Sequence, residues 1–156
     1  MSTTSSPRRS QAHPTDNDRL LNGIRDLLLA SDRARHHMAT VFRLTLTDLA
    51  ALSHLGTCDN LGQRQIAQRL GLTASATTAL LDRLETLDLA RREPHPADRR
   101  RIQVNLTQGG RERIKDVRKL YASALAAVPS ADLAHATNFL EQLSTELARA
   151  VINAGG

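Results

Sequence analysis

The sequence predicts a mainly α-helical fold with one small β-hairpin, and its centre is expected to be a helix-turn-helix followed by that hairpin as a wing. Apolar residues recur at three- and four-residue steps over most of the chain, which is the spacing of amphipathic helices. Two such segments, at 64–70 and from 74 onward, are separated only by a tight turn. Between 90 and 106 the pattern changes to alternation around a loop rich in proline and arginine, which is typical of a hairpin.

Composition limits the classes of function. The 156 residues are 40% hydrophobic, enough for one core, and the net charge of +5 with a pI near 10.6 favours an anionic partner. Only 2% of residues are aromatic, which argues against base stacking on single-stranded nucleic acid and favours a duplex or a phosphate surface. Cys58 is the single cysteine, and no stretch approaches the roughly 20 apolar residues of a membrane-spanning helix. These features predict a cytoplasmic protein.

The first half of the chain is expected to begin with a disordered arm and two helices. Residues 1–17 are polar and interrupted by proline, with no apolar centre. A long amphipathic helix is expected over 18–42. A short helix follows over 48–55, with Thr47 suited to be its N-cap and Gly56 suited to end it in a left-handed turn.

The helix-turn-helix is followed by the hairpin and by two further helices. Thr73 is suited to cap the second helix of the pair, and Thr107 is suited to cap a long helix that reaches about residue 128. A last helix is expected over 131–152. The expected core-facing residues of the second helix and of the hairpin are Leu80, Leu81, Leu84, Leu87, Ile102, Val104 and Leu106. The terminal helices have more apolar surface than one small domain can cover, which predicts a symmetric dimer.

Three stretches then resemble the MarR family of bacterial winged-helix regulators: LTDLAALSHL, RQIAQRLGLTASATTALLDRLETLDLARRE and DRRRIQVNLTQGG. They cover 46–110 in order and without large gaps. The specific part is Asp-Arg-Arg, then an alternating strand, then Leu-Thr-x-x-Gly; the helix-turn-helix alone is weak evidence. The chain departs from the family pattern at Gly62 and Gln65, where Ser or Thr and Glu are frequent, at Asp88, where Gly is usual, and at Ala79, where a basic residue is frequent.

The resemblance implies a homodimer that binds pseudo-palindromic double-stranded DNA, usually as a repressor. It also implies release by an effector, because many members of the family leave DNA when a small phenolic or other anionic ligand binds. It implies four parts: a disordered arm at 1–17, a dimerisation helix at 18–45, a winged helix-turn-helix DNA-binding domain at 46–107 and C-terminal dimerisation helices at 108–156. An alternative is a basic winged-helix module that binds DNA or a protein without a ligand.

The wing carries the strongest candidates for DNA contact. Five arginines against Glu93 and Asp98 give the hairpin a net charge of +3. A narrow minor groove concentrates negative potential and accepts an arginine from a protruding loop. The resemblance assigns this insertion to Arg100 and the bracing role to Asp98, with Arg99 and Arg101 beside them. The alternative is an ordinary solvated loop.

The helix-turn-helix contributes a second set of candidates. Small hydroxyl side chains at the start of its second helix allow a close approach to phosphates, base edges or thymine methyl groups. These candidates are Thr73, Ser75, Thr77 and Thr78, with Arg64 and Arg69 of the preceding helix as phosphate contacts. The alternatives are that Thr73 only caps the helix, that Thr77 packs inward, and that both arginines are solvated surface.

The family places an effector pocket where the first, second and fifth helices meet. The residues of this chain at those positions are Arg33, His37, Met38, Val41, Phe42, Leu52 and Arg118. The apolar members would form a floor and the basic ones would fix a carboxylate or phenolate. The alternative is plain helix packing with a basic surface.

Other chemistry has little support in the sequence. The six histidines have no recognised zinc spacing, although helices from two subunits are able to converge on a metal. Cys58 has no cation cluster near it in sequence and lies away from the first long helix, where the peroxide-sensing branch of the family has its cysteine. No catalytic triad, carboxylate pair or glycine-rich phosphate loop has supporting context, so neither an enzyme nor a cofactor is expected. An enzyme or a metal sensor is the remaining rival class.

Overall fold

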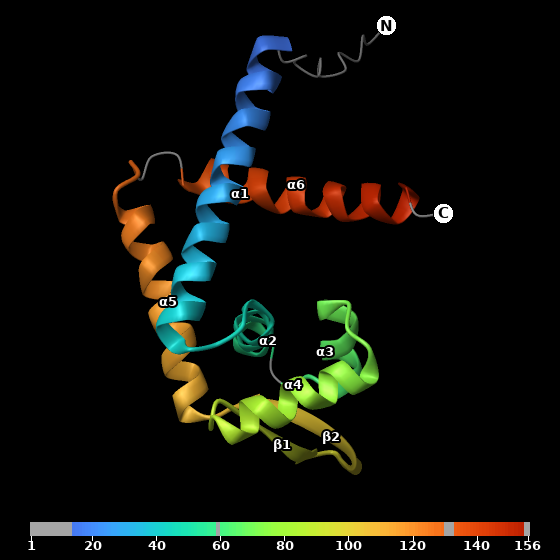
Figure 1. Ribbon diagram of the computed structural model, residues 1–156. Helices are drawn as coiled ribbons and strands as arrows, with labels where there is room; N and C mark the ends of the chain where they lie inside the picture. The colour runs from blue at the N-terminus through green and yellow to red at the C-terminus, as the bar shows by residue number, and fades with distance from the viewer. Residues whose placement is uncertain (1–13, 59, 130–132, 155–156) are drawn as a thin grey trace, which may run out of the picture. The chain divides into compact units, whose positions relative to one another are not determined.

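The computed structural model describes residues 14–58, 60–129 and 133–154, apart from the side chains of Pro14, Thr15, Arg99 and Arg100. Within these ranges the elements in chain order are α1 (Pro14–Phe42), α2 (Leu46–Thr57), α3 (Gln63–Leu70), α4 (Ala74–Thr86), β1 (Ala90–His95), β2 (Asp98–Leu106), α5 (Gln108–Ala126) and α6 (Leu133–Ala154) (Figure 1). The fold is therefore the expected one, mainly helical with one two-stranded antiparallel hairpin.

The chain divides into two compact units. The first extends to Arg111 and contains α1 to α4, the hairpin and the first residues of α5. The second begins at Glu112 and contains the rest of α5 and α6. The division therefore lies inside α5, one turn after the helix begins.

The core of the first unit lies between α2, α3, α4 and the hairpin. Its largest side chains that are less than 2% exposed are Leu49, Leu52, Ile66, Leu80, Leu81, Leu84 and Val104, together with Thr77 and Asp48. The segment before α3 completes the β-layer, because the Val104 N–H donates to the Leu61 carbonyl at 2.8 Å and forms an isolated antiparallel bridge. Strand β2 is thereby paired with β1 on one side and bridged to Leu61 at Val104 on the other.

Two residues expected to face the core are exposed. Leu87 is 46% exposed and follows the last residue of α4, and Ile102 is 49% exposed on β2. Both match the periodicity of their elements, but Leu87 follows the end of α4 and Ile102 pairs with Pro94 toward the turn of the hairpin. A hydrophobic stripe indicates which face of an element is apolar, and it does not show how far along that face other elements pack.

Three helices end in Schellman motifs, each with one residue in the left-handed region. At the end of α4 the Leu89 N–H donates to the Leu84 carbonyl at 2.9 Å, and the left-handed residue between them is Asp88, with φ of 51°. Gly71 has the same role after α3, and Arg43 has it after α1. The glycine that the family resemblance leads one to expect at residue 88 is thus replaced by aspartate in the same backbone conformation.

Three expected boundaries were wrong. Helix α1 begins at Pro14, inside the segment expected to be a disordered arm; residues 1–13 lie outside the described part of the chain. Proline is tolerated in the first helical turn because its missing N–H has no partner there. The N-cap of α2 is Thr45 and not Thr47, and Gly56 lies within α2 instead of ending it.

Candidate nucleic-acid interface

A tight turn joins α3 to α4. Gly71 ends α3, and the next-but-one residue, Thr73, begins α4 as its N-cap. The Thr73 hydroxyl accepts from the Ala76 N–H at 3.2 Å, which confirms the predicted cap. Ile66 of α3 and Leu80 and Leu81 of α4 are buried in the same core, so their packing holds the two helices as one helix-turn-helix.

The exposed side of α4 carries two of the predicted hydroxyl groups. Ser75 and Thr78 are exposed, and Ser75 Oγ lies 3.2 Å from Thr73 Oγ1. Thr78 Oγ1 accepts a hydrogen bond of 2.7 Å from Gln63 Nε2, at the first turn of α3. Gln63 was not among the candidates, since no signal along the sequence links residues 15 positions apart.

Thr77 is not part of this exposed side. Its residue is 0% exposed, and its hydroxyl donates to the Thr73 carbonyl at 2.8 Å. A side chain buried in this way is not available to DNA, so the expectation of a contact from Thr77 was wrong and its inward-packing alternative is correct.

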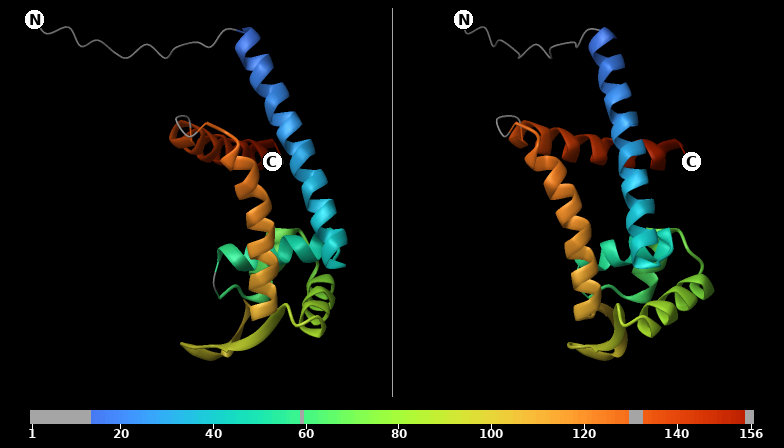
Figure 2. Two further views of the ribbon diagram at one scale, coloured as in Figure 1. Left: turned by 90° about the vertical axis from the view of Figure 1, so that its left-hand side faces the viewer. Right: turned by 60° about the vertical axis from the view of Figure 1, so that its left-hand side comes forward.

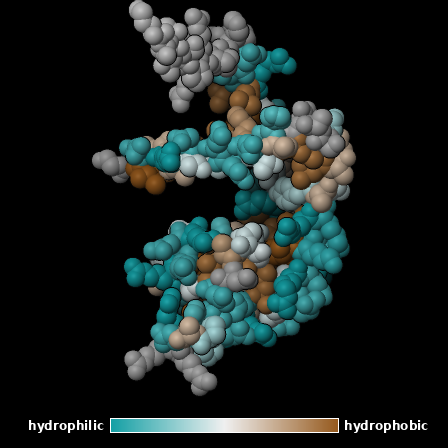
Figure 3. Space-filling view, turned by 180° about the vertical axis from the view of Figure 1, so that it is seen from behind, coloured by the Kyte–Doolittle hydropathy of each residue, from teal (hydrophilic) through white to brown (hydrophobic). Residues whose placement is uncertain are grey.

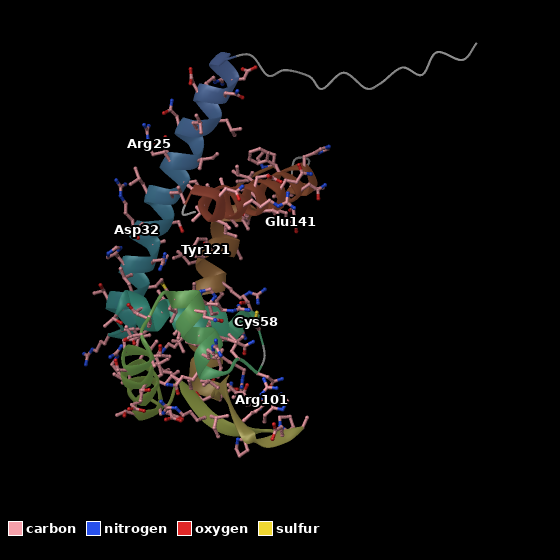
Figure 4. The ribbon with its side chains drawn as sticks, turned by 90° about the vertical axis from the view of Figure 1, so that its right-hand side faces the viewer. Arg25, Asp32, Cys58, Arg101, Tyr121 and Glu141 are labelled. Carbon is pink, nitrogen blue, oxygen red and sulfur yellow. The ribbon has the colours of Figure 1, made fainter. Side chains whose placement is uncertain are left out.

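The hairpin forms a wing that projects beside α4 of the helix-turn-helix (Figure 2). Ala90 pairs with Leu106 and Pro94 with Ile102, and the register shifts before the turn, where His95 faces Asp98. Asp98 and Arg101 are exposed on β2, and Figure 4 shows Arg101 on the hairpin. The side chains of Arg99 and Arg100 lie outside the described residues, so the insertion assigned to Arg100 stays a prediction.

The arginines at the base of the hairpin have carboxylate partners. Arg91 Nε lies 2.5 Å from Glu93 Oε1, and Arg92 contacts Asp82 and Glu85 of α4. The count of five arginines against two carboxylates therefore overstates the positive charge at the base, because Asp82 and Glu85 come from another element. The excess of positive charge belongs to the outer part of the wing, at 99–101.

The arginines of α3 differ in their surroundings. Both Arg64 and Arg69 are exposed, as a phosphate contact requires. Arg69 Nη1 also donates to Cys58 Sγ at 3.2 Å, across the loop between α2 and α3. The fold thus brings one cation to Cys58 from 11 positions away, which the sequence did not indicate.

An ion pair between a buried carboxylate and a half-exposed arginine holds α4 against α2. Asp48 is 1% exposed, and its carboxylate receives three hydrogen bonds of 2.5 to 3.1 Å from Arg83 Nε and Nη2. The Thr45 N–H donates to the same carboxylate at 2.9 Å. Burial raises the pKa of Asp48, but the hydrogen bonds from Arg83 and Thr45 lower it more, and the pKa lies below its usual value. This pair connects the start of α2 to the helix that carries the exposed hydroxyls.

The candidate effector residues fall into three groups. Met38 and Leu52 are buried at 9% and 0% exposure, which fits helix packing. Phe42 is half-buried, whereas Arg33, His37 and Val41 are exposed at four-residue steps and so share one face of α1. Arg118 is exposed on α5 in the second unit.

Two kinds of site have no candidate within the part of the chain that the structure describes. No group of three or more histidine, cysteine, aspartate or glutamate side chains is placed to hold a metal ion. None of the helices in that part has the length and hydropathy needed to cross a bilayer.

The helix-turn-helix and wing described above agree with the known proteins that the chain resembles. The family model described as MarR family matches residues 44–101. A Bacillus subtilis protein named as the uncharacterized HTH-type transcriptional regulator YcgE is 32% identical over 83 residues, which are 52% of this chain and 54% of that protein. Residues 44–101 are therefore similar to the MarR family. The chain spans about half the length of that curated relative.

Solved structures extend the likeness beyond the matched region. The crystal structure of RV1404 from Mycobacterium tuberculosis has 27% identity and a TM-score of 0.63, and the match covers 89% of this chain and 97% of that one. The S. aureus MepR–DNA complex has 22% identity and a TM-score of 0.56, and the match covers 78% and 96%. At this identity the second likeness concerns the winged helix-turn-helix fold alone.

Proposed function

We propose that this chain is a transcriptional regulator of the MarR family that binds double-stranded DNA by sequence and acts in the cytoplasm as a repressor. The supporting observation is the exposed hydroxyl side of α4 next to a wing whose outer part is arginine-rich. Small hydroxyls allow a close approach to the major groove, and arginines favour the narrow minor groove. The known complex of MepR with DNA supports the same use of this fold.

The wing contact can be tested first. The unaltered protein is used to select duplexes from a randomised pool, and its affinity for the selected duplex is measured at fixed salt. Arg100→Ala should weaken binding by about 1–3 kcal/mol, with the largest effect on duplexes with A·T-rich flanks. Unchanged affinity sinks this assignment. Equal binding to every duplex favours the ligand-independent basic module.

We also propose that the protein acts as a homodimer. The supporting observation is the number of large apolar side chains exposed on the terminal helices. They include Leu21, Leu27, Leu28, Leu147, Val151 and Ile152, each more than half exposed. Figure 3 shows hydrophobic residues at the surface of α1 and α6. Two heads in a symmetric dimer would bind half-sites about one DNA turn, roughly 34 Å, apart.

An effector that releases DNA is the finer part of the proposal. Arg33, His37 and Val41 form an exposed face with two basic groups and one apolar group, which suits an aromatic acid. The test is a calorimetric titration of salicylate into the protein with and without the selected duplex, repeated with His37→Ala and Arg33→Ala. Because linkage is reciprocal, salicylate must weaken DNA binding by the factor by which DNA weakens salicylate binding. Binding without such coupling rules out release by this acid.

A further inference from the structure

Arg92 of β1 contacts three residues that follow one another along one side of α4, at successive turns. Its Nη1 lies 2.8 Å from Asp82 Oδ1 and also contacts the Glu85 carboxylate. Its Nη2 donates to the Thr78 carbonyl at 3.3 Å. Its backbone N–H donates to Glu85 Oε1 at 2.7 Å, so the strand and the side chain contact the same carboxylate. Thr78, Asp82 and Glu85 are spaced four and three residues apart, which places them on one face of the helix.

The contacts continue into α3. Thr78, whose carbonyl accepts from Arg92, also accepts from Gln63 through its hydroxyl at 2.7 Å. A continuous polar network therefore joins the first turn of α3, the middle of α4 and the start of β1. The Arg92 side chain is 23% exposed, so water competes less for its contacts than for those of a surface ion pair.

This network resists one particular motion. The base of the hairpin is already held by the buried side chains of Ala90 and Val104 and by the bridge from Val104 to Leu61. Arg92 adds contacts from β1 to the Thr78 carbonyl and to the carboxylates of Asp82 and Glu85, and these further restrain rotation of the hairpin relative to α4. A guanidinium is suited to this because its planar fork reaches several acceptors at fixed angles, whereas a lysine ammonium is a point charge.

We propose that Arg92 is a positioning residue that fixes the wing relative to α4, so that both contact one duplex at the same time. The proposal rests on the proposed function as a DNA-binding regulator. It predicts that the contribution of a wing arginine to affinity depends on Arg92, whereas the contribution of an α3 arginine does not. It also predicts that lysine is a poor substitute, although lysine keeps the positive charge beside Asp82 and Glu85.

The test is a double-mutant cycle on the duplex selected by the unaltered protein. Arg101→Ala should weaken binding about fivefold in the native background and less than twofold in the Arg92→Lys background. Arg64→Ala is the matched control, and its effect should be the same in both backgrounds. Full retention of the Arg101→Ala effect in the Arg92→Lys background overturns the proposal, and so does native affinity for Arg92→Lys alone.

A second variant tests the proposal in case Arg92→Lys does not fold. Asp82 is 61% exposed at its side chain, so Asp82→Asn removes one partner of Arg92 at a tolerant position and should show the same coupling to Arg101→Ala in smaller measure. Circular dichroism and thermal unfolding show whether each variant is folded. If Arg92→Lys is unfolded, a lack of coupling in Asp82→Asn overturns the proposal. If the unaltered protein selects no duplex, the proposed function fails first; if it selects one and no coupling is found, only the role of Arg92 fails.

Discussion

The structure explains why the Leu-Thr-x-x-Gly motif has glycine at residue 110. A Cβ atom at Gly110 would lie 2.0 Å from the Leu89 carbonyl oxygen, so no side chain fits. The approach is fixed by Thr107, whose hydroxyl donates to the Asp88 carbonyl at 2.5 Å and accepts from the Gly110 N–H at 3.1 Å. The start of α5 is thereby fastened against the turn between α4 and β1.

Gly110→Ala should therefore lower the free energy of unfolding by about 3 kcal/mol, because a backbone carbonyl must move to make room. Urea unfolding at constant pH measures this loss. Gly23→Ala is the control, since a Cβ there meets nothing within 4 Å and the residue lies inside α1. That control should raise stability by roughly 0.5–1 kcal/mol. An alanine at residue 110 with native stability would contradict the close approach.

Asp88 is a second residue at which the backbone conformation sets the effect of a substitution. Its φ of 51° is a conformation that glycine adopts without the steric cost of a Cβ atom. Asp88→Gly should raise the melting temperature, and Asp88→Val should lower it, by amounts equivalent to about 1 kcal/mol each. A fall in melting temperature for Asp88→Gly would mean that the carboxylate makes a stabilising contact that outweighs the strain.

At the scale of elements, the Asp48–Arg83 pair links stability to pH. The native pKa of Asp48 lies below its usual value near 4, so the unfolded chain binds a proton more readily than the native one. The contribution of the pair is therefore complete above about pH 4 and is lost as the pH falls through the native pKa.

Asp48→Asn should accordingly lower the free energy of unfolding at pH 7 by about 1–3 kcal/mol, because Arg83 loses a buried charged partner. The difference from the unaltered protein should shrink as the pH falls below about 4. Asp116→Asn is a matched control, since Asp116 forms an exposed pair with Lys119 at 3.0 Å and should cost little. A constant difference at all pH values would exclude Asp48 as the titrating group.

At the scale of the whole molecule, none of the residues that the structure describes on α6 is buried within one chain. An apolar helix face left in water is unfavourable, and burial of each large aliphatic side chain contributes about 1.5–3 kcal/mol. Light scattering at micromolar concentration should therefore show a dimer.

Leu147→Glu should shift that dimer toward monomer, since Leu147 is 63% exposed in one chain and lies on the apolar side of α6. Gln142→Glu adds the same charge on the opposite side of the same helix and should leave the dimer intact. A monomer for the unaltered protein, or equal effects of both variants, would contradict the proposed dimer.

Local signals in the sequence were sufficient for most of the fold. The caps Thr73 and Thr107, the turn at Gly71 and the alternation of Val104 and Leu106 each depend on neighbouring residues, and all were predicted. The two threonines at 45 and 47 show the limit of such signals. Either is a suitable cap by type, and Thr45 caps α2 because Asp48, three residues later, completes the reciprocal pair of hydrogen bonds.

The sequence by itself determined the resemblance to the MarR family, the order of elements and the hydroxyl and arginine types that face DNA in the proposal. Only the tertiary structure decided that Thr77 points inward and that Arg92 is paired with α4. It also placed Arg83 beside Asp48, 35 residues away. The physical reason is that a periodic pattern defines faces of one element, whereas ion pairs and burial depend on which other element lies against that face.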